Sequence, residues 1–202
     1  MKNSSKINSA LKFLEKNDPV IARLITKHGK CLLSPHDNYF KSLCSSIISQ
    51  QLSAKAASNI FNRFSLLLQD QFTPNFVLSH SSDELRSCGI SFRKASYLFS
   101  LSELFLSDSE FFDNVDSYSN SDIISKLTSV KGIGLWTSQM FLIFNLCRLD
   151  VMPYDDVSIK NSVKMNYNLS SIPSKSELEI ISAGWGEYSS VACWYLWRDI
   201  DS

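Results

Sequence analysis

The stretch Leu127–Phe144, LTSVKGIGLWTSQMFLIF, places Gly-Ile-Gly between two apolar segments with helical patterning. Glycine lets the backbone at 132 and 134 reach conformations that are closed to other residues. Without side chains there, an anion can approach the amide groups that begin the next helix. The pattern therefore predicts a tight turn that can hold a phosphate group. The alternative is an ordinary connection, in which Gly132 ends one helix and Gly134 begins another.

The residues around this turn have the spacing of a helix-hairpin-helix. In that motif, apolar side chains at Leu127, Val130 and Ile133 lock the two helices together, while backbone N–H groups face one DNA phosphate. Such contacts position DNA without reading its sequence. The residues expected to contact DNA here are Lys131, Gly132, Ile133, Gly134 and Thr137.

Composition limits the class of protein. The 202 residues contain 20 Lys and Arg against 20 Asp and Glu, so a DNA-binding face would have to come from local segregation of charge. Five widely spaced cysteines without a C-x-x-C pair favour neither a disulfide framework nor a metal cluster. No run has the length of a signal peptide core or a membrane span. We expect an intracellular monomer with no membrane partner, nuclear if eukaryotic and cytoplasmic if bacterial.

Apolar residues recur with helical spacing along nearly the whole chain, and strand signals are scarce. The fold class is therefore expected to be all-α. The acidic, Ser-rich stretch 107–121 is expected to be a loop, with at most one helical turn near Glu110. The other expected helices cover 7–14, 19–29, 39–48, 54–68 after an N-cap at Ser53, a short segment from Ser82 closed by Gly89, 92–106 after Ser91, 123–127, 136–146, a helix from Asp155, and a final helix through Trp197.

Two neighbouring carboxylates follow the second hairpin helix. In VMPYDDVSIK, Pro153 stops any preceding helix and Asp155 is a natural N-cap. Asp156 then falls in the first helical turn, where the dipole favours an anion. Taken alone, both aspartates could serve only as capping residues, and Lys160 could simply pair with Asp156.

The order of hairpin, apolar helix, extended link and Asp resembles the helix-hairpin-helix DNA glycosylase superfamily. Three further stretches, SSIISQQLSAKAASNIFNRF (45–64), LRSCGISFRKASYL (85–98) and SVACWYLWR (190–198), resemble its alkylbase (3-methyladenine type II) branch. The resemblance implies one domain over 1–202 with two helical lobes and an active-site cleft between them. Lobe one would comprise roughly 36–120, and lobe two 1–35 plus 121–202.

The resemblance also implies roles for individual residues. Asp156 would stabilise the cationic sugar as the base leaves. Gln51, with Leu52 as the apolar alternative, would fill the gap left by an extruded nucleotide, although Gln51 could also be a solvated turn residue. Trp136, Trp197, Tyr39 and Met140 would line the substrate pocket, where aromatic faces attract cationic alkylated purines, although tryptophan at helical spacing is often core.

Related glycosylases that also cleave the strand place a lysine two residues after the second hairpin glycine, where it forms a Schiff base with the sugar, but this chain has Trp136 there. We therefore expect a monofunctional enzyme that leaves an abasic site. No cofactor is expected for the chemistry. In similar hairpins, carbonyls equivalent to those of Thr128, Val130 and Gly132 hold a structural Na⁺ or K⁺.

Some residues depart from the family pattern. Glu187-Tyr188-Ser189-Ser190 replaces a Pro-Tyr-Arg-Ser stretch, and Met140 stands where some members have an aromatic residue. These departures keep open a second hypothesis, a weak or inactive homologue that binds abasic or distorted double-stranded DNA. The basic candidates for the DNA face, each also explicable as a solvated surface charge, are Lys55, Arg63, Arg93, Lys94, Lys131 and Lys160.

Overall fold

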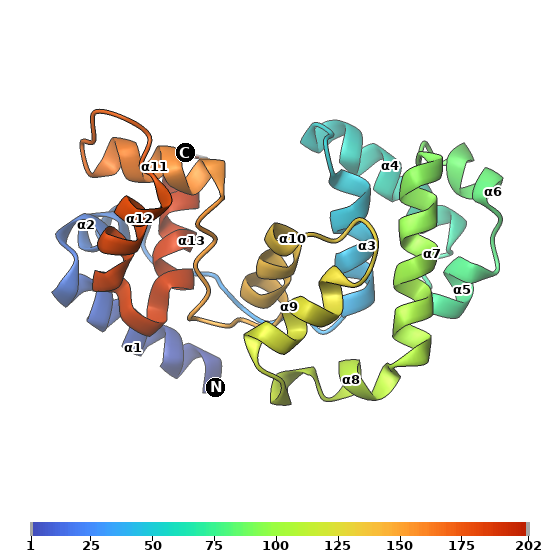
Figure 1. Ribbon diagram of the computed structural model, residues 1–202, viewed down its shortest axis with the longest axis horizontal. Helices are drawn as coiled ribbons and strands as arrows, with labels where there is room; N and C mark the ends of the chain where they lie inside the picture. Colours follow the sequence, from blue (N-terminus) through green and yellow to red (C-terminus); the bar gives the residue numbers. More distant parts are fainter. Residues whose placement is uncertain (1, 201–202) are drawn as a thin grey trace. The chain divides into compact units, whose positions relative to one another are not determined.

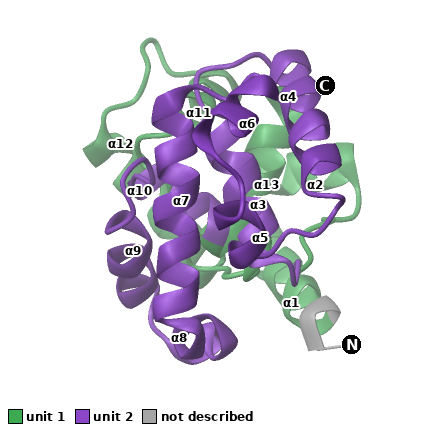
Figure 2. Cartoon of the chain, turned by 90° about the vertical axis from the view of Figure 1, so that its right-hand side faces the viewer, with its two compact units in different colours: residues 1–35, 142–202 green, residues 36–141 purple. Residues whose placement is uncertain are grey.

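The computed structural model describes residues 2–200 and consists of helices joined by turns and by two longer links, 29–38 and 146–156 (Figure 1). No strand occurs among these residues, so the all-α prediction is confirmed. Contacts divide the chain into two compact units: unit 1 comprises residues 1–35 and 142–202, and unit 2 comprises 36–141 (Figure 2). The predicted cleft between two lobes stays a prediction.

The lobe boundary expected after residue 120 differs from the observed division. Residues 121–141 belong with 36–120, because side chains from that part of the chain hold them. Gln50 Nε2 donates to the carbonyl of Gly132 at 2.8 Å, and the rings of Tyr39 and Phe141 meet edge to face with centroids 5.4 Å apart.

Unit 1 combines the two ends of the chain, and its last helix packs against the first two. Asp18 holds the junction between those two helices. It caps the second helix by accepting from the N–H groups of Val20 and Ile21, and its other oxygen accepts from Tyr167 Oη and Trp185 Nε1. The helices of unit 1 are α1 (Lys2–Asn17), α2 (Pro19–His28), α11 (Val157–Asn166), α12 (Lys175–Ser182), the 3₁₀ segment η3 (Ala183–Tyr188) and α13 (Ser189–Ile200).

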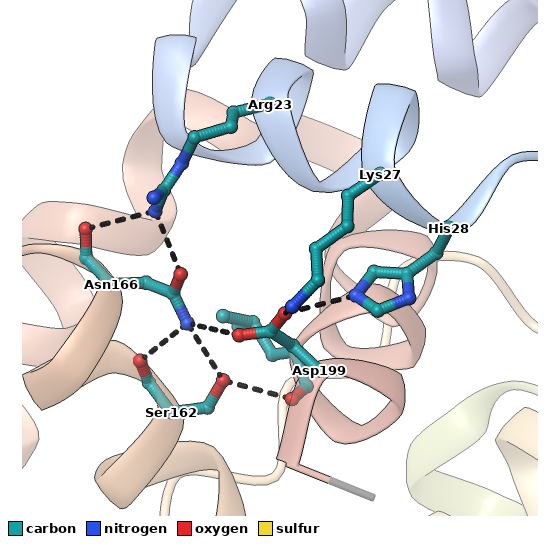
Figure 3. Close-up of polar contacts among 7 residues, drawn as sticks. Arg23, Lys27, His28, Ser162, Asn166 and Asp199 are labelled. Atoms are coloured by element: carbon teal, nitrogen blue, oxygen red, sulfur yellow. Dashed lines mark hydrogen bonds and ion pairs between the residues drawn. The ribbon is translucent and has the colours of Figure 1, made fainter. Parts of the chain in front are cut away.

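A polar cluster also ties α2, α11 and α13 together (Figure 3). The Asp199 carboxylate accepts from Lys27 Nζ at 2.6 Å, from Asn166 Nδ2 at 3.0 Å and lies 2.9 Å from His28 Nε2. Arg23 donates to the Asn166 side chain at 2.7 Å. These contacts join residues from opposite ends of the sequence, so unit 1 requires both.

Unit 2 is one continuous segment in which α3 packs against both α4 and α7. It ends at Phe141, the first residue of a π-helical turn, η2 (Phe141–Asn145), whose residues 142–145 belong to unit 1. Its other helices are α3 (Tyr39–Ser49), α4 (Ala54–Leu67), α5 (Pro74–Leu78), α6 (Ser82–Ser87), α7 (Phe92–Ser107), α8 (Ser109–Asp113), the 3₁₀ segment η1 (Val115–Ser117), α9 (Asn120–Thr128) and α10 (Leu135–Met140).

Most helix signals were predicted correctly. Ser53 and Ser91 are N-caps whose side chains accept from the backbone, and Gly89 follows α6 with φ +93°. The helices α5 and α12 were missed, although Thr73 before Pro74 and the Ser174–Glu177 capping box are recognisable start signals. The stretch 107–121 contains α8 and η1, and the expected helix 136–146 divides into α10 and the π turn.

Candidate functional site

The glycine turn between α9 and α10 has the geometry that its sequence predicts. Leu127, Val130 and Ile133 are buried and join the two helices. Gly132 has φ +94°, and the ring of Tyr97 packs against it so closely that an added Cβ would lie 2.1 Å from Tyr97 Cδ2. Gly134 caps α10 in an extended conformation with open space around it. The first glycine is therefore required by the fold, whereas the second leaves room for a ligand.

The backbone N–H groups of this turn differ in whether they already donate a hydrogen bond within the protein. The N–H of Ile133 donates to the Val130 carbonyl at 3.0 Å, whereas the N–H groups of Gly132 and Gly134 donate to no described residue. Lys131 is exposed beside them. Thr137 is buried, so its contribution to an anion site would come from its N–H in the first turn of α10. An anion at this turn would be held by backbone donors and one lysine charge.

The three carbonyls named for a monovalent cation are partly engaged. Gly132 O accepts from Gln50 Nε2, and Val130 O accepts from the Ile133 N–H. The amide hydrogens of Gln50 therefore occupy one acceptor position of the Gly132 oxygen, and the second lone pair of that oxygen is the one that could face a cation. The cation assignment stays a prediction. Among the described residues, no group of three or more His, Cys, Asp or Glu side chains is placed to hold a metal ion.

The turn between α3 and α4 presents Gln51. This residue has φ +58°, a left-handed conformation that costs a non-glycine residue about 1–2 kcal/mol, and it is exposed. Leu52 is 39% exposed and lines a small cavity of about 110 Å³ together with Ile48 and Lys94. The residue that would fill the gap left by an extruded nucleotide is called the wedge below. Of its two candidates, Gln51 is exposed, whereas Leu52 partly covers the surface of its own unit.

Asp156 begins α11, but as its N-cap rather than in its first turn. Its Oδ1 accepts from the Ile159 N–H at 2.8 Å and from Trp197 Nε1 at 3.2 Å, and the residue is only 6% exposed. The capping role expected for Asp155 was therefore wrong. Asp155 is exposed, and its Oδ1 lies 3.7 Å from Lys160 Nζ. The Asp156 carboxylate thus accepts from two N–H donors at the N-terminus of α11.

The extended link that leads to Asp156 is anchored on α13. Ser190 Oγ accepts from the Val151 N–H at 3.0 Å and donates to the Val151 carbonyl at 3.1 Å, while the Ser190 N–H donates to Leu149 O. Cys193 Sγ contacts Met152 Sδ at 3.5 Å. The departure from the family pattern at 187–190 thus retains a buried serine that fixes the approach to the carboxylate.

The expected pocket residues occur in both units. In unit 2, Trp136 is 50% exposed on α10, Met140 lies one turn further on, and Tyr39 packs against Phe141. In unit 1, Trp197 contacts Phe144 with ring centroids 5.5 Å apart and donates to Asp156. Trp136 is therefore not a core residue, and Trp197 is a direct partner of the candidate catalytic group.

The basic candidates fall into two groups. Arg63 Nε donates to Cys88 O at 2.8 Å, and Lys94 Nζ donates to Ile48 O and Gln50 O, so these two charges bind the protein's own backbone. Lys55, Arg93 and Lys131 are exposed. The internal role of Lys94 was not foreseen, because its partners lie 44 and 46 residues away in sequence. The same holds for Gln50, whose partner in the hairpin is 82 residues away.

These features match known proteins. Residues 44–187 match the family described as "HhH-GPD superfamily base excision DNA repair protein". The chain belongs to this superfamily.

The chain is also similar to curated proteins and to solved structures. The chain is 33% identical to the alkylbase DNA glycosidase-like protein mag2 of Schizosaccharomyces pombe, over 98% of this chain and 96% of that protein. It is 40% identical to DNA-3-methyladenine glycosylase 1 of the same yeast, over 79% and 71%. Among solved structures, S. pombe 3-methyladenine DNA glycosylase Mag1 in complex with abasic DNA superposes with a TM-score of 0.84 at 35% identity, covering 96% of this chain and 97% of that one.

Proposed function

We propose that this protein is a monofunctional DNA glycosylase that excises alkylated purines of the 3-methyladenine and 7-methylguanine type and leaves an abasic site. The observation that carries the proposal is the Asp156 carboxylate, which two N–H donors hold at the start of α11. The 3-methyladenine DNA glycosylase of S. pombe that is 40% identical supports the substrate class. The enzyme acts as a monomer on double-stranded DNA inside the cell.

The DNA is held by the hairpin and opened by the wedge. Gly132 and Gly134 direct N–H groups at one phosphate, which fixes the register of the backbone without reading bases. The target nucleotide leaves the stack, and Gln51 fills the gap from its exposed turn. Because the net charge is zero, binding depends on these few contacts rather than on a general attraction to DNA.

The chemistry follows from the charge of the leaving base. The bond between C1′ and the base nitrogen breaks, and its electron pair neutralises the positive charge of the alkylated purine. Asp156 stabilises the positive charge that develops on the sugar, a water molecule attacks C1′, and the proton of that water passes to the carboxylate. Trp136, in the position where a lysine would form a Schiff base, allows no covalent step, so the strand stays intact. The exposed face of Trp136 attracts the cationic base.

An excision assay with a matched pair of aspartates tests this function. Methylated duplex DNA is incubated with enzyme, and the released purines are separated and quantified. We expect Asp156→Asn to lower the release rate roughly 10²–10³-fold. Asparagine is as good an N-cap as aspartate, so α11 should stay folded. Asp155→Asn, which changes an exposed neighbour, should keep the wild-type rate. Equal rates for all three proteins would contradict the proposal.

One observation favours a second function, the binding of abasic DNA without excision. Asp156 Oδ1 already accepts two hydrogen bonds and the residue is nearly buried, so the carboxylate serves the fold as well. Under this alternative, the wild-type protein releases no purine even in excess over DNA, yet binds a duplex that contains an abasic-site analogue more tightly than an undamaged duplex. Purine release that depends on Asp156 would exclude it.

A further inference from the structure

The carbonyl groups that end α3 face a lysine from another helix. Lys94 Nζ, near the start of α7, lies 2.7 Å from Ile48 O and 2.8 Å from Gln50 O. A helix leaves its last carbonyls without partners and carries a partial negative charge at that end. Hydrogen bonds from an ammonium group to such carbonyls are shorter and stronger than neutral ones. They fix the path of the chain where it enters the turn that presents Gln51.

The same turn has a second tie. The Gln50 side chain donates to Gly132 O at 2.8 Å, which connects the turn to the phosphate-facing hairpin. Within the turn, the Leu52 N–H donates to Ser49 O at 3.1 Å. Gln51 is therefore held in its left-handed conformation by contacts on both sides, from α7 and from the hairpin.

The position of Lys94 is unfavourable for α7 itself. A cation in the first turn of a helix opposes its dipole. Burial lowers the pKa of the Lys94 ammonium, and the neighbouring Arg93 charge lowers it further. The contacts that compensate these costs are the two carbonyls of the wedge turn, so the lysine serves that turn rather than its own helix.

We propose that Lys94 is a positioning residue for base extrusion: it holds the Gln51 turn in the shape that enters DNA, and Gln50 couples that turn to the hairpin on the phosphate. The inference rests on the proposed function, because it requires Gln51 to fill a gap in the duplex. Without Lys94, a non-glycine residue with φ +58° relaxes toward ordinary conformations, and the wedge no longer matches the gap. Contacts with undamaged DNA do not use the wedge and are retained.

The measured quantity is the selectivity, defined as the dissociation constant for undamaged duplex divided by that for a duplex with an abasic-site analogue. Lys94→Met keeps an unbranched side chain as far as Cε and removes the ammonium. We expect it to lower the selectivity about tenfold, the size typical of losing a hydrogen bond from a charged group. Arg93→Met removes an exposed charge from the same turn of α7. It should weaken binding to both duplexes equally and leave the selectivity unchanged.

A double-mutant cycle identifies the route of the effect. If Lys94 acts through the wedge, Lys94→Met should have no further effect on selectivity in the Gln51→Ala background. Gln50→Leu, which removes the other tie, should also lower the selectivity, and it gives a second test if Lys94→Met does not fold. The inference is overturned if selectivity survives in folded Lys94→Met or Gln50→Leu, if Arg93→Met lowers it equally, or if the Lys94 effect persists without Gln51. A wild-type protein with no selectivity would instead contradict the proposed function.

Discussion

The two hairpin glycines make different demands at the scale of single residues. Gly132 combines φ +94° with the ring of Tyr97 against its Cα, so no side chain can be added without moving that ring. Gly134 has φ −99°, which any residue adopts, and open space around it. Nothing in the fold requires glycine at 134, so the space there is available for the close approach of a phosphate.

This difference gives a prediction with an internal control. Gly132→Ala should lower the free energy of unfolding by about 2 kcal/mol or more, because alanine is strained at positive φ and collides with Tyr97. Gly134→Ala should leave unfolding unchanged and weaken binding to duplex DNA, because its methyl group occupies the space where the phosphate approaches. Denaturant unfolding and DNA titration of both variants check this. A Gly134→Ala protein with full affinity would contradict the phosphate site at this turn.

Some residues of the site could be predicted from the sequence, and others could not. Gly132, Gly134 and the Asp155–Asp156 pair follow local rules, because turns and helix caps depend on neighbouring residues. Even so, the cap was assigned one residue too early, at Asp155 instead of Asp156. The contacts of Lys94 and Gln50 join helices far apart in sequence, and no local pattern distinguishes a lysine that binds backbone carbonyls from one in solvent.

At the scale of elements, helix boundaries that depend on neighbouring residues could be predicted from the sequence, whereas features that depend on distant residues could not. Serine caps and glycine ends predicted α4 and α7 closely, because each signal lies within one turn of the boundary. The π turn after α10 could not be predicted, since 136–146 has a continuous helical pattern. The link before α11 was expected to be extended, but its anchor on α13 depends on Ser190, about forty residues further along the chain. Elements are thus encoded locally, and their connections to one another are not.

The anchoring of this link on α13 can be tested. Ser190→Ala leaves both polar groups of Val151 without their partner in a buried environment, which should lower the free energy of unfolding by about 1–3 kcal/mol. Because the link leads directly to Asp156, purine release should fall even at temperatures where the variant is fully folded. Ser189→Ala is the control, because Ser189 Oγ donates within its own turn to Gly186 O. Equal activity of the two folded variants would show that the link does not position the carboxylate.

At the scale of the whole molecule, unit 2 is one continuous segment and unit 1 is assembled from both chain ends. The joining contacts of unit 1 are partly ionic: Lys27 of α2 pairs with Asp199 of α13, and His28 Nε2 lies 2.9 Å from the same carboxylate (Figure 3). Burial alone would raise the pKa of the Asp199 carboxyl. The hydrogen bonds from Lys27, Asn166 and His28, together with the Lys27 charge, instead hold that pKa well below its ordinary value of 3.8.

No helix among the described residues has the length and apolar character needed to cross a bilayer.

Acid should therefore lower the stability of unit 1, and protonation of the Asp199 carboxylate should account for part of this loss. Because its pKa is lower in the folded protein, the unfolded chain binds the proton first as pH falls below about 4. The stability that Asp199 contributes is thus complete at neutral pH and is lost as pH falls from near 3.8 toward the lower folded value. Asp199→Asn should be about 1–2 kcal/mol less stable than wild type at pH 7, and the two proteins should converge in acid. Denaturant unfolding across this pH range measures the difference. Asp113→Asn, an exposed control, should stay parallel to wild type throughout. Because the folded pKa of Asp199 lies well below 3.8, the gap between wild type and Asp199→Asn should narrow by pH 2 without closing, and a gap that keeps its full neutral-pH size there would mean that packing, rather than charge, makes the connection.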